Sequence, residues 1–123
     1  MKRVTVVEDN VDSRLLLTAI LGSAYEVAEY GTGPDALDGM RRSRPDLVLL
    51  DIGLPGMDGV EVLAHMRADS ELCRLPVIVL TARAMSGDRE TFLDAGFDDY
   101  VSKPIVDEQV LLDAIERLLG MRA

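Results

Sequence analysis

The sequence contains a single cysteine, Cys73, and no apolar run long enough to cross a membrane. One cysteine cannot form an intrachain disulfide, which suits the reducing environment of the cytoplasm. The apolar part of the N-terminus is too short for a signal peptide and ends at the acidic residue Glu8. Internal repeats, low-complexity tracts and linkers are also missing. We therefore expect one compact cytoplasmic domain over residues 1–123, with no membrane partner.

Positive charge is scarce as well. The chain has 13 Lys and Arg residues against 22 Asp and Glu residues, which gives a net charge of −9. Because binding to nucleic acid depends on neutralising phosphates, this balance argues against direct nucleic-acid binding. Lysine is rarer still, since only Lys2 and Lys103 are present and only Lys103 lies in the interior of the chain.

Apolar patterning predicts five strands. Residues 4–7, 47–50 and 77–80 are β-branched or aliphatic runs, which are typical of strands buried on both faces of a parallel sheet. Residues 25–30 alternate like a half-exposed strand, and residues 97–101 predict a short one. Helical spacing and helix-start residues predict a helix after each strand, beginning at Asn10, Gly33, Gly59, Ser86 and Asp107.

This alternation predicts an α/β fold with a doubly wound, five-stranded parallel sheet and helices on both faces. Right-handed crossovers and burial of the most apolar later strands favour the strand order 2-1-3-4-5, as in flavodoxin-like folds. On the first helix we expect an inward stripe formed by Leu15, Leu16, Ala19 and Ile20. On the last helix we expect a stripe formed by Val110, Leu111, Ala114, Ile115 and Leu118.

Two leucines of the last helix, Leu112 and Leu119, lie off its expected stripe. They either anchor a partner or a symmetric dimer, or they widen the buried stripe. The phase of a helix read from sequence does not distinguish these alternatives.

Polar residues follow the strands where these end. Glu8 and Asp9 follow the first strand, Asp51 the third, Thr81 the fourth and Lys103 the fifth. In open α/β sheets, ligands bind at this carboxyl edge. The strand order places the first and third strands side by side, so the three carboxylates should converge. Their mutual repulsion is roughly 1 kcal/mol per pair even with water-like screening, and a hard cation such as Mg²⁺ relieves it.

The two remaining side chains suit a phosphoryl group. The ammonium of Lys103 can hold one phosphoryl oxygen, and Thr81 supplies a neutral hydroxyl donor beside the small residue Ala82. Each feature alone has a simpler interpretation: an acidic pair after a strand often caps a helix, and an aspartate can merely end a strand. The convergence of all of them on one edge favours a site.

Four motifs, in this order, resemble the receiver domain of bacterial response regulators over essentially the whole chain. Single-domain, chemotaxis-type regulators are the nearest in length. The motifs are Glu8-Asp9, Asp51 with Leu54-Pro55-Gly56-Met57-Asp58-Gly59, Thr81-Ala82, and Tyr100-Val101-Ser102-Lys103-Pro104.

The resemblance implies a phosphorylation-activated switch of a two-component phosphorelay. Asp51 would accept a phosphoryl group from a histidine kinase or phosphotransfer protein. Mg²⁺ would be held by Glu8, Asp9, Asp51 and the backbone carbonyl of Gly53. The acidic pair is Glu-Asp here, where many members have Asp-Asp. Because glutamate is one methylene longer, Glu8 would contact the metal either directly or through a water.

The remaining motif residues would bind and read the phosphoryl group. Thr81 and Lys103 would contact it, with a cis peptide bond between Lys103 and Pro104, and Tyr100 would report the switch. The face formed by the fourth helix, fifth strand and fifth helix would then control a downstream protein target, or form a homodimer. Such a protein is a phosphoacceptor that catalyses its own phosphotransfer and slow autodephosphorylation, and is not an enzyme acting on a separate substrate.

Two other functions compete with this interpretation. Mg²⁺-dependent phosphohydrolases also use an aspartate nucleophile after a strand, but they carry a second aspartate two residues later as acid and base; here that position is Gly53. A flavin carrier of the same topology would need phosphate-binding donors in its first loop, where Glu8 and Asp9 would repel a phosphate.

Overall fold

The computed structural model describes residues 1–82 and 88–120 and contains ten regular elements. The strands are β1 (Arg3–Val7), β2 (Glu26–Tyr30), β3 (Leu47–Asp51), β4 (Val77–Thr81) and β5 (Asp99–Ser102). The helices are α1 (Val11–Leu21), α2 (Gly33–Arg42), α3 (Gly59–Ala68), α4 (Asp88–Ala95) and α5 (Glu108–Gly120). The expected start of the fourth helix at Ser86 lies outside the described residues. No helix within the described residues is both long and apolar enough to span a bilayer.

The five strands form one parallel sheet in the order β2-β1-β3-β4-β5, which confirms the predicted fold class. β1 lies between β2 and β3, with Val6 opposite Leu49, and β3 pairs with β4, with Asp51 opposite Leu80. Successive connections therefore wind in opposite directions on the two sides of β1. The carboxyl ends of β1 and β3 lie side by side at this switch point, where ligands of open α/β sheets bind.

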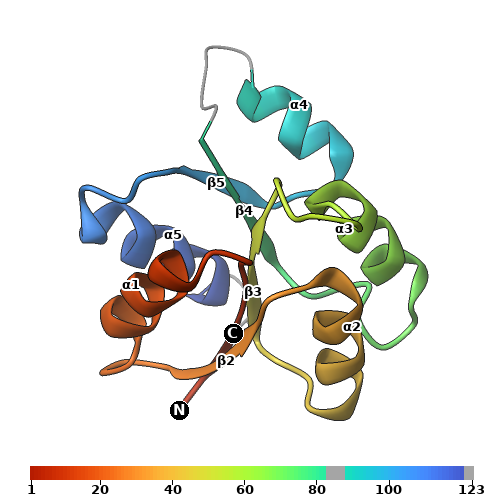
Figure 1. Ribbon diagram of the computed structural model, residues 1–123, viewed down its shortest axis with the longest axis horizontal. Coiled ribbons are helices and arrows are strands. Elements are labelled where there is room, and N and C mark those ends of the chain that lie inside the picture. Colours follow the sequence, from red (N-terminus) through yellow and green to blue (C-terminus); the bar gives the residue numbers. More distant parts are fainter. Residues whose placement is uncertain (83–87, 121–123) are drawn as a thin grey trace.

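Helices cover both faces of the sheet, α1 and α5 on one face and α2, α3 and α4 on the other (Figure 1). β3 and β4 are buried at every residue, because their aliphatic side chains point alternately into two separate cores. The core beneath α1 and α5 includes Leu17, Leu49 and Ile115, and the core beneath α2 and α3 includes Met40, Leu50 and Met66.

Side-chain caps fix where the helices begin. The Oδ1 atom of Asn10 accepts a hydrogen bond from the Ser13 N–H at 2.9 Å, and Asp58 caps α3 in the same way at 2.9 Å. A cap of this kind stabilises a helix by about 1 kcal/mol. Gly59 permits a close approach, since a Cβ there would lie 2.7 Å from the carbonyl oxygen of Asp51. α3 can therefore start directly against the end of β3.

The helix phases differ from the expected stripes. In α1 the buried residues are Leu17, Ile20 and Leu21, while Leu15 and Leu16 are exposed. The stripe predicted on α1 is therefore wrong except at Ile20. In α5, Leu111, Ala114 and Ile115 are buried and Leu118 is partly buried, but Val110 is 54% exposed. Leu112 and Leu119 are partly buried and pack against the core, which favours the alternative that they widen the buried stripe.

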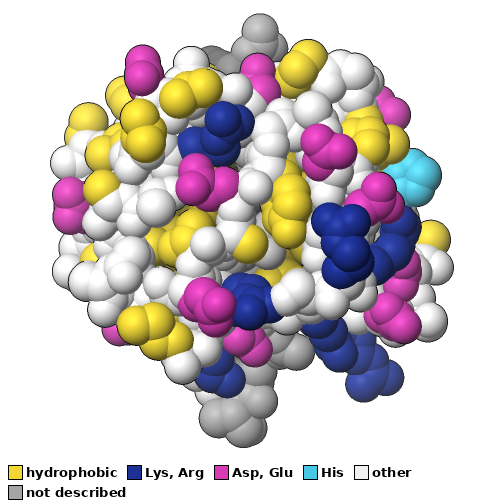
Figure 2. Space-filling model, turned by 60° about the horizontal axis from the view of Figure 1, so that its bottom comes forward, with side chains coloured by type: hydrophobic (Ala, Val, Ile, Leu, Met, Phe, Trp, Pro, Cys, Tyr) yellow, Lys and Arg dark blue, Asp and Glu magenta, His cyan; other side chains and the backbone are white. Residues whose placement is uncertain are grey.

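The amino-terminal edge of the sheet lies opposite the switch point. Basic side chains gather on the face of the molecule that contains this amino-terminal edge (Figure 2). The chain places six of its 13 basic residues at the start of β1 and in or just after the helices that return to this edge. They are Lys2, Arg3, Arg41, Arg42, Arg44 and Arg74.

Candidate functional site

Three carboxylates meet at the switch point. Glu8 and Asp9 directly follow β1, and Asp51 is the last residue of β3. One oxygen of each carboxylate lies within 4.8 Å of an oxygen of the others. Glu8 is fully buried, Asp51 is 7% exposed and Asp9 is exposed, so the cluster runs from the interior to the surface.

Lys103 is the cation nearest to this cluster among the described residues. Its Nζ atom donates to Glu8 Oε2 at 2.7 Å and lies 3.5 Å from Asp51 Oδ2. Burial raises the pKa of Glu8, and the neighbouring charge of Asp51 raises it further, against the effect of its bonds to Lys103 and Asn10. Burial acts to lower the pKa of Lys103, but its contacts with Glu8 and Asp51 outweigh burial and raise it. The excess of negative charge in the pocket raises the pKa of Lys103, and it adds through Asp51 to the effect of burial on the pKa of Glu8.

Asp51 is oriented by the turn that follows it. Its Oδ1 atom accepts a hydrogen bond from the Gly53 N–H at 3.1 Å, which leaves Oδ2 on the side of Lys103. Gly53 itself is exposed and sits beside the carboxylate. Gly56 has a φ of 77°, a value that favours glycine, and the tight turn there leads the chain back to α3.

Thr81 ends β4 at the same edge and is buried. Its carbonyl oxygen accepts a hydrogen bond from the Lys103 N–H at 2.8 Å, which ties β4 to the residue that carries the ammonium. Thr81 lies two residues after Val79, the register partner of Tyr100. Because strand side chains alternate, Thr81 and Tyr100 belong to the same face of the sheet, the one covered by α4.

The segment after β5 borders the site beside Glu8 and Lys103. The peptide bond between Lys103 and Pro104 is cis. Pro104 and Ile105 then line a small cavity of about 60 Å³ together with Glu8, Lys103 and Leu16. The start of α1 and the segment leading to α5 therefore meet next to the buried carboxylate.

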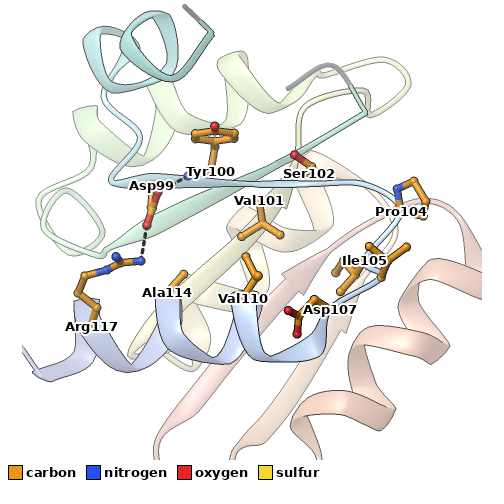
Figure 3. A pocket seen from close by; sticks show the side chains of 11 residues that line it. Asp99, Tyr100, Val101, Ser102, Pro104, Ile105, Asp107, Val110, Ala114 and Arg117 are labelled. Atoms are coloured by element: carbon orange, nitrogen blue, oxygen red, sulfur yellow. Dashed lines mark hydrogen bonds and ion pairs between the residues drawn. The ribbon is translucent and has the colours of Figure 1, made fainter. Parts of the chain in front are cut away.

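A larger groove of about 400 Å³ runs between β5 and α5, with Val101 and Ala114 among its lining residues. At one end, Arg117 donates to Asp99 Oδ2 at 3.0 Å (Figure 3). Tyr100 points away from α5, to the opposite side of β5 from Val101 (Figure 3). The ring of Tyr100 lies 6.2 Å from the ring of Phe92, which comes from α4.

One contact at the site was not anticipated. Arg14, on α1, donates from Nη1 to the carbonyl oxygen of Glu8 at 2.8 Å and reaches that of Asp9 at 3.5 Å. The residue types give no signal for it, because a side chain that binds backbone carbonyls needs no particular partner in the sequence. The exposed apolar residues Val11, Leu15 and Leu16 beside this site were also missed, since the stripe of α1 was assigned to another face.

The carboxylate cluster fits a hard divalent cation. Carboxylate oxygens are the ligands that Mg²⁺ prefers, and two oxygens bound to one Mg²⁺ lie at most about 4.2 Å apart. The 4.8 Å limit within which the three carboxylates lie is close to this distance. Lys103 Nζ lies 3.5 Å from Asp51 Oδ2, and Thr81 ends the neighbouring strand β4. An ammonium and a hydroxyl are groups suited to binding an anion.

Comparisons with known proteins identify the family and the fold of the chain. A family model described as the response regulator receiver domain matches residues 4–116. Two proteins named polar-differentiation response regulator DivK, from Brucella anthropi and Brucella ovis, are 45% and 44% identical over 120 residues, which cover 97% of this chain and of each relative.

Solved structures of similar chains share the fold. Chemotaxis protein CheY4 from Vibrio cholerae matches with a TM-score of 0.87 at 25% identity, covering 96% of this chain and 98% of that one. The receiver domain of the sensor histidine kinase PA1611 from Pseudomonas aeruginosa matches with a TM-score of 0.87 at 36% identity, covering 97% and 98%. That structure has a magnesium ion coordinated in its active-site cleft.

Proposed function

Because the chain belongs to the family of response regulator receiver domains, a family of two-component signalling proteins, we propose that it is a phosphorylation-activated switch whose phosphoacceptor is Asp51. The observation that carries this proposal is the position of Asp51 at the switch point, between two further carboxylates and the ammonium of Lys103. We further propose that residues 1–123 act as one receiver domain, and that it works in the cytoplasm, where a single unpaired cysteine is expected.

Mg²⁺ is the proposed cofactor, held by Asp9, Asp51 and the backbone carbonyl of Gly53. Both oxygens of Glu8 are already engaged, Oε2 by Lys103 at 2.7 Å and Oε1 by the Asn10 N–H at 3.2 Å. Each oxygen keeps a second lone pair, but a cation bound directly to Glu8 would share an oxygen with one of these donors. We therefore propose that Glu8 contributes to the metal site through a water and at the same time holds Lys103 in place.

The chemistry is a transfer of one phosphoryl group between two proteins. A carboxylate oxygen of Asp51 attacks the phosphorus of a phosphohistidine, the P–N bond breaks, and the phosphoryl group becomes a mixed anhydride on Asp51. The bound cation supplies neutralisation of the charge on the transferring group. Lys103, 3.5 Å from Asp51 Oδ2, holds a phosphoryl oxygen, and Thr81 donates its hydroxyl to another. Gly53 offers no side chain for the proton transfer that rapid hydrolysis would need.

The phosphodonor must reach Asp51, and an exposed apolar surface lies beside it. Val11, Leu15 and Leu16 of α1 are 58%, 62% and 43% exposed, and Val106, in the segment leading to α5, is 91% exposed. Leu16 and the neighbouring Ile105 line the same small cavity next to Glu8 and Lys103. We propose that the histidine kinase or phosphotransfer protein docks here, because this surface adjoins the phosphoacceptor.

The output is proposed to run through Thr81 and Tyr100, which share one face of the sheet. When Thr81 bonds to the phosphoryl group, it vacates volume on this face, and Tyr100 can rotate toward that volume and away from Phe92. The change would alter the surface of α4, β5 and α5, which is proposed to bind a downstream protein target or a second copy of the chain. The groove between β5 and α5, with the exposed Val110 at its lining, belongs to this surface.

Phosphorylation by a small donor tests the proposal directly. Incubation with acetyl phosphate and Mg²⁺ should add one phosphoryl group by intact mass, and chelation with EDTA should abolish the addition. Asp51→Asn should not be phosphorylated, whereas Asp58→Asn, which changes the cap of α3 close to the site, should be phosphorylated like the wild type. An Asp51→Asn chain that gains the adduct to the wild-type level would overturn the assignment, and steady release of phosphate at enzymatic rates would favour a phosphohydrolase.

A further inference from the structure

We infer that Arg14 is a positioning residue for the metal site: its guanidinium holds the backbone of Glu8 and Asp9 so that their carboxylates face Asp51. This inference rests on the proposed Mg²⁺ site. The Nη1 atom of Arg14 donates to the carbonyl oxygen of Glu8 at 2.8 Å and reaches that of Asp9 at 3.5 Å. It therefore binds the backbone of the acidic pair and does not occupy a carboxylate oxygen of either residue.

The loop needs such a restraint because it carries two of the three clustered charges. Only Glu8, Asp9 and Asn10 connect β1 to α1. Glu8 is fixed at its N–H, which donates to the Tyr30 carbonyl at 3.0 Å, and at its side chain by Lys103. Asp9 is exposed, and the contact with Arg14 is the one hydrogen bond that it makes within the described residues. Repulsion from the neighbouring carboxylates therefore acts on a residue whose one hydrogen bond within the described residues comes from Arg14.

The surroundings of Arg14 are arranged to receive the guanidinium. Its Nε atom lies 3.8 Å from Glu29 Oε1 on β2, and its side chain is 23% exposed. In the turn after β2, a Cβ on Gly31 would lie 3.0 Å from Arg14 Nη1, closer than side chains normally approach. Glycine at position 31 leaves room for Nη1 to reach the loop.

Three substitutions separate the geometry of this contact from its charge. Arg14→Ala removes both, and loss of an outer contact of this kind typically weakens metal binding 10- to 100-fold, so we expect the Kd for Mg²⁺ to rise about tenfold. Arg14→Lys keeps the charge on a single ammonium and should fall between Arg14→Ala and the wild type. Gly31→Ala keeps the arginine but displaces its guanidinium, so it should also weaken Mg²⁺ binding.

The experiment is a calorimetric titration of each folded, metal-free variant with MgCl₂. Arg41→Ala is the matched control, because it removes the same charge and an ion pair with Asp69 at the far edge of the sheet. Arg41→Ala should bind Mg²⁺ like the wild type. The double variant Arg14→Ala with Gly31→Ala should bind like Arg14→Ala alone, because the added methyl group acts only through the arginine.

A second readout separates positioning from a general structural role. With acetyl phosphate as donor, Arg14→Ala should need more Mg²⁺ for half-maximal phosphorylation and return to the wild-type rate when Mg²⁺ is saturating. A Kd for Mg²⁺ within twofold of the wild type in both Arg14→Ala and Gly31→Ala would overturn the inference. An equal loss of Mg²⁺ affinity in Arg41→Ala would also overturn it. Either result would leave the proposed function intact. A wild-type chain that does not bind Mg²⁺ would overturn the metal site itself.

Discussion

At the scale of single residues, Lys103 decides the electrostatics of the pocket. Its ammonium is shared between Glu8, whose side chain is 1% exposed, and Asp51, whose side chain is 10% exposed. One positive charge therefore serves two buried carboxylates, with Asp9 nearby as a third. A buried carboxylate that loses its counterion retains the full cost of desolvation. Lys103 thus stabilises the fold as well as serving the proposed chemistry.

Removing this ammonium gives a prediction about stability without metal. In EDTA, Lys103→Met should lower the free energy of unfolding by about 2 kcal/mol, because Glu8 is left buried and charged without its donor. Glu8→Gln should recover much of this loss in the double variant, with a coupling energy between the two sites of about 1–3 kcal/mol. Urea titrations of the four chains measure this energy.

The exposed ion pair between Arg3 and Glu26 provides the matched control, with a separation of 3.1 Å. The same cycle with Arg3→Met and Glu26→Gln should give a coupling energy below about 1 kcal/mol, because solvent screens the pair. Equal coupling energies in the two cycles would mean that burial does not strengthen the contact between Lys103 and Glu8.

At the scale of elements, strands were easier to predict than helix faces. The runs that form β3 and β4 are aliphatic on both faces, so no choice of phase was needed, and their order followed from which strands must be central. α1 instead carries apolar residues around most of its circumference, at Val11, Leu15, Leu16, Leu17, Ile20 and Leu21. Several stripes fit such a helix, and packing against β1 and β3, which sequence does not show, selects the one that is buried.

In the candidate site, too, the positions of residues at strand ends were predictable and the detailed contacts were not. Glu8, Asp9, Asp51 and Lys103 could be placed at one edge because each follows a strand whose position was predictable. The distances among them could not be predicted, nor could the engagement of both Glu8 oxygens, since these depend on rotamers and loop paths. The Arg14 contact was missed because backbone carbonyls are present at every residue and leave no pattern in the sequence.

A connection between two helices gives a prediction about pH. Asp69, just after α3, accepts a hydrogen bond from Arg41 Nε of α2 at 2.8 Å and one from the Glu71 N–H at 2.8 Å. The bond from Arg41, followed by that from Glu71, holds the pKa of Asp69 below its usual value. A lowered pKa in the folded state means that ionised Asp69 stabilises the fold above the unfolded-state pKa of about 3.9. This contribution is lost as the pH falls through the lowered value.

Asp69→Asn should therefore lower the urea midpoint at neutral pH, and its deficit relative to the wild type should shrink as the pH is lowered below about 4. Asp94→Asn, at an exposed position of α4, is the control and should show no such dependence. A deficit that stays constant from neutral to acid pH would show that the charge of Asp69 does not contribute.

The coupling of β4 to β5 and α4 gives a further prediction. Beryllofluoride, a mimic of the phosphoryl group, should bind at Asp51 in Thr81→Ala as in the wild type. Without the hydroxyl, however, the amide shifts that it causes in α4, β5 and α5 should shrink sharply by NMR, because the contact that favours the active arrangement is lost. Thr81→Ser, which keeps the hydroxyl, should restore them. Full-sized distant shifts in Thr81→Ala would exclude this route.

At the scale of the whole molecule, charge is distributed unevenly between the two edges of the sheet. The net charge is −9, and at least six of the 13 basic residues lie at or near the amino-terminal edge, while three carboxylates converge at the opposite edge. Exposed charges separated by more than about 10 Å are largely screened at physiological salt, so the distant arginines do little to offset the carboxylate cluster. The free domain therefore keeps a destabilising concentration of negative charge at the place where a cation is proposed to bind.

Metal binding should accordingly raise global stability. A ligand that binds only the folded state adds about 2.7 kcal/mol at a hundred times its Kd, which corresponds to a rise in Tm of about 10 °C for a domain of this size. We expect the wild type to show such a rise with Mg²⁺. Asp9→Ala should be slightly more stable than the wild type in EDTA, by about 0.5–1 kcal/mol, because it removes one of the like charges without touching the core. It should also lose the response to Mg²⁺.

Asp94→Ala is the control for this experiment, since it removes one exposed charge away from the cluster and should keep the full response. Because Arg14 binds the backbone carbonyl of residue 9, Asp9→Ala retains that contact, and the loss of metal response can be assigned to the carboxylate. A wild-type melting temperature that does not change with Mg²⁺ would contradict the metal site. An Asp9→Ala chain that still gains the full 10 °C or so would place the cation on other ligands.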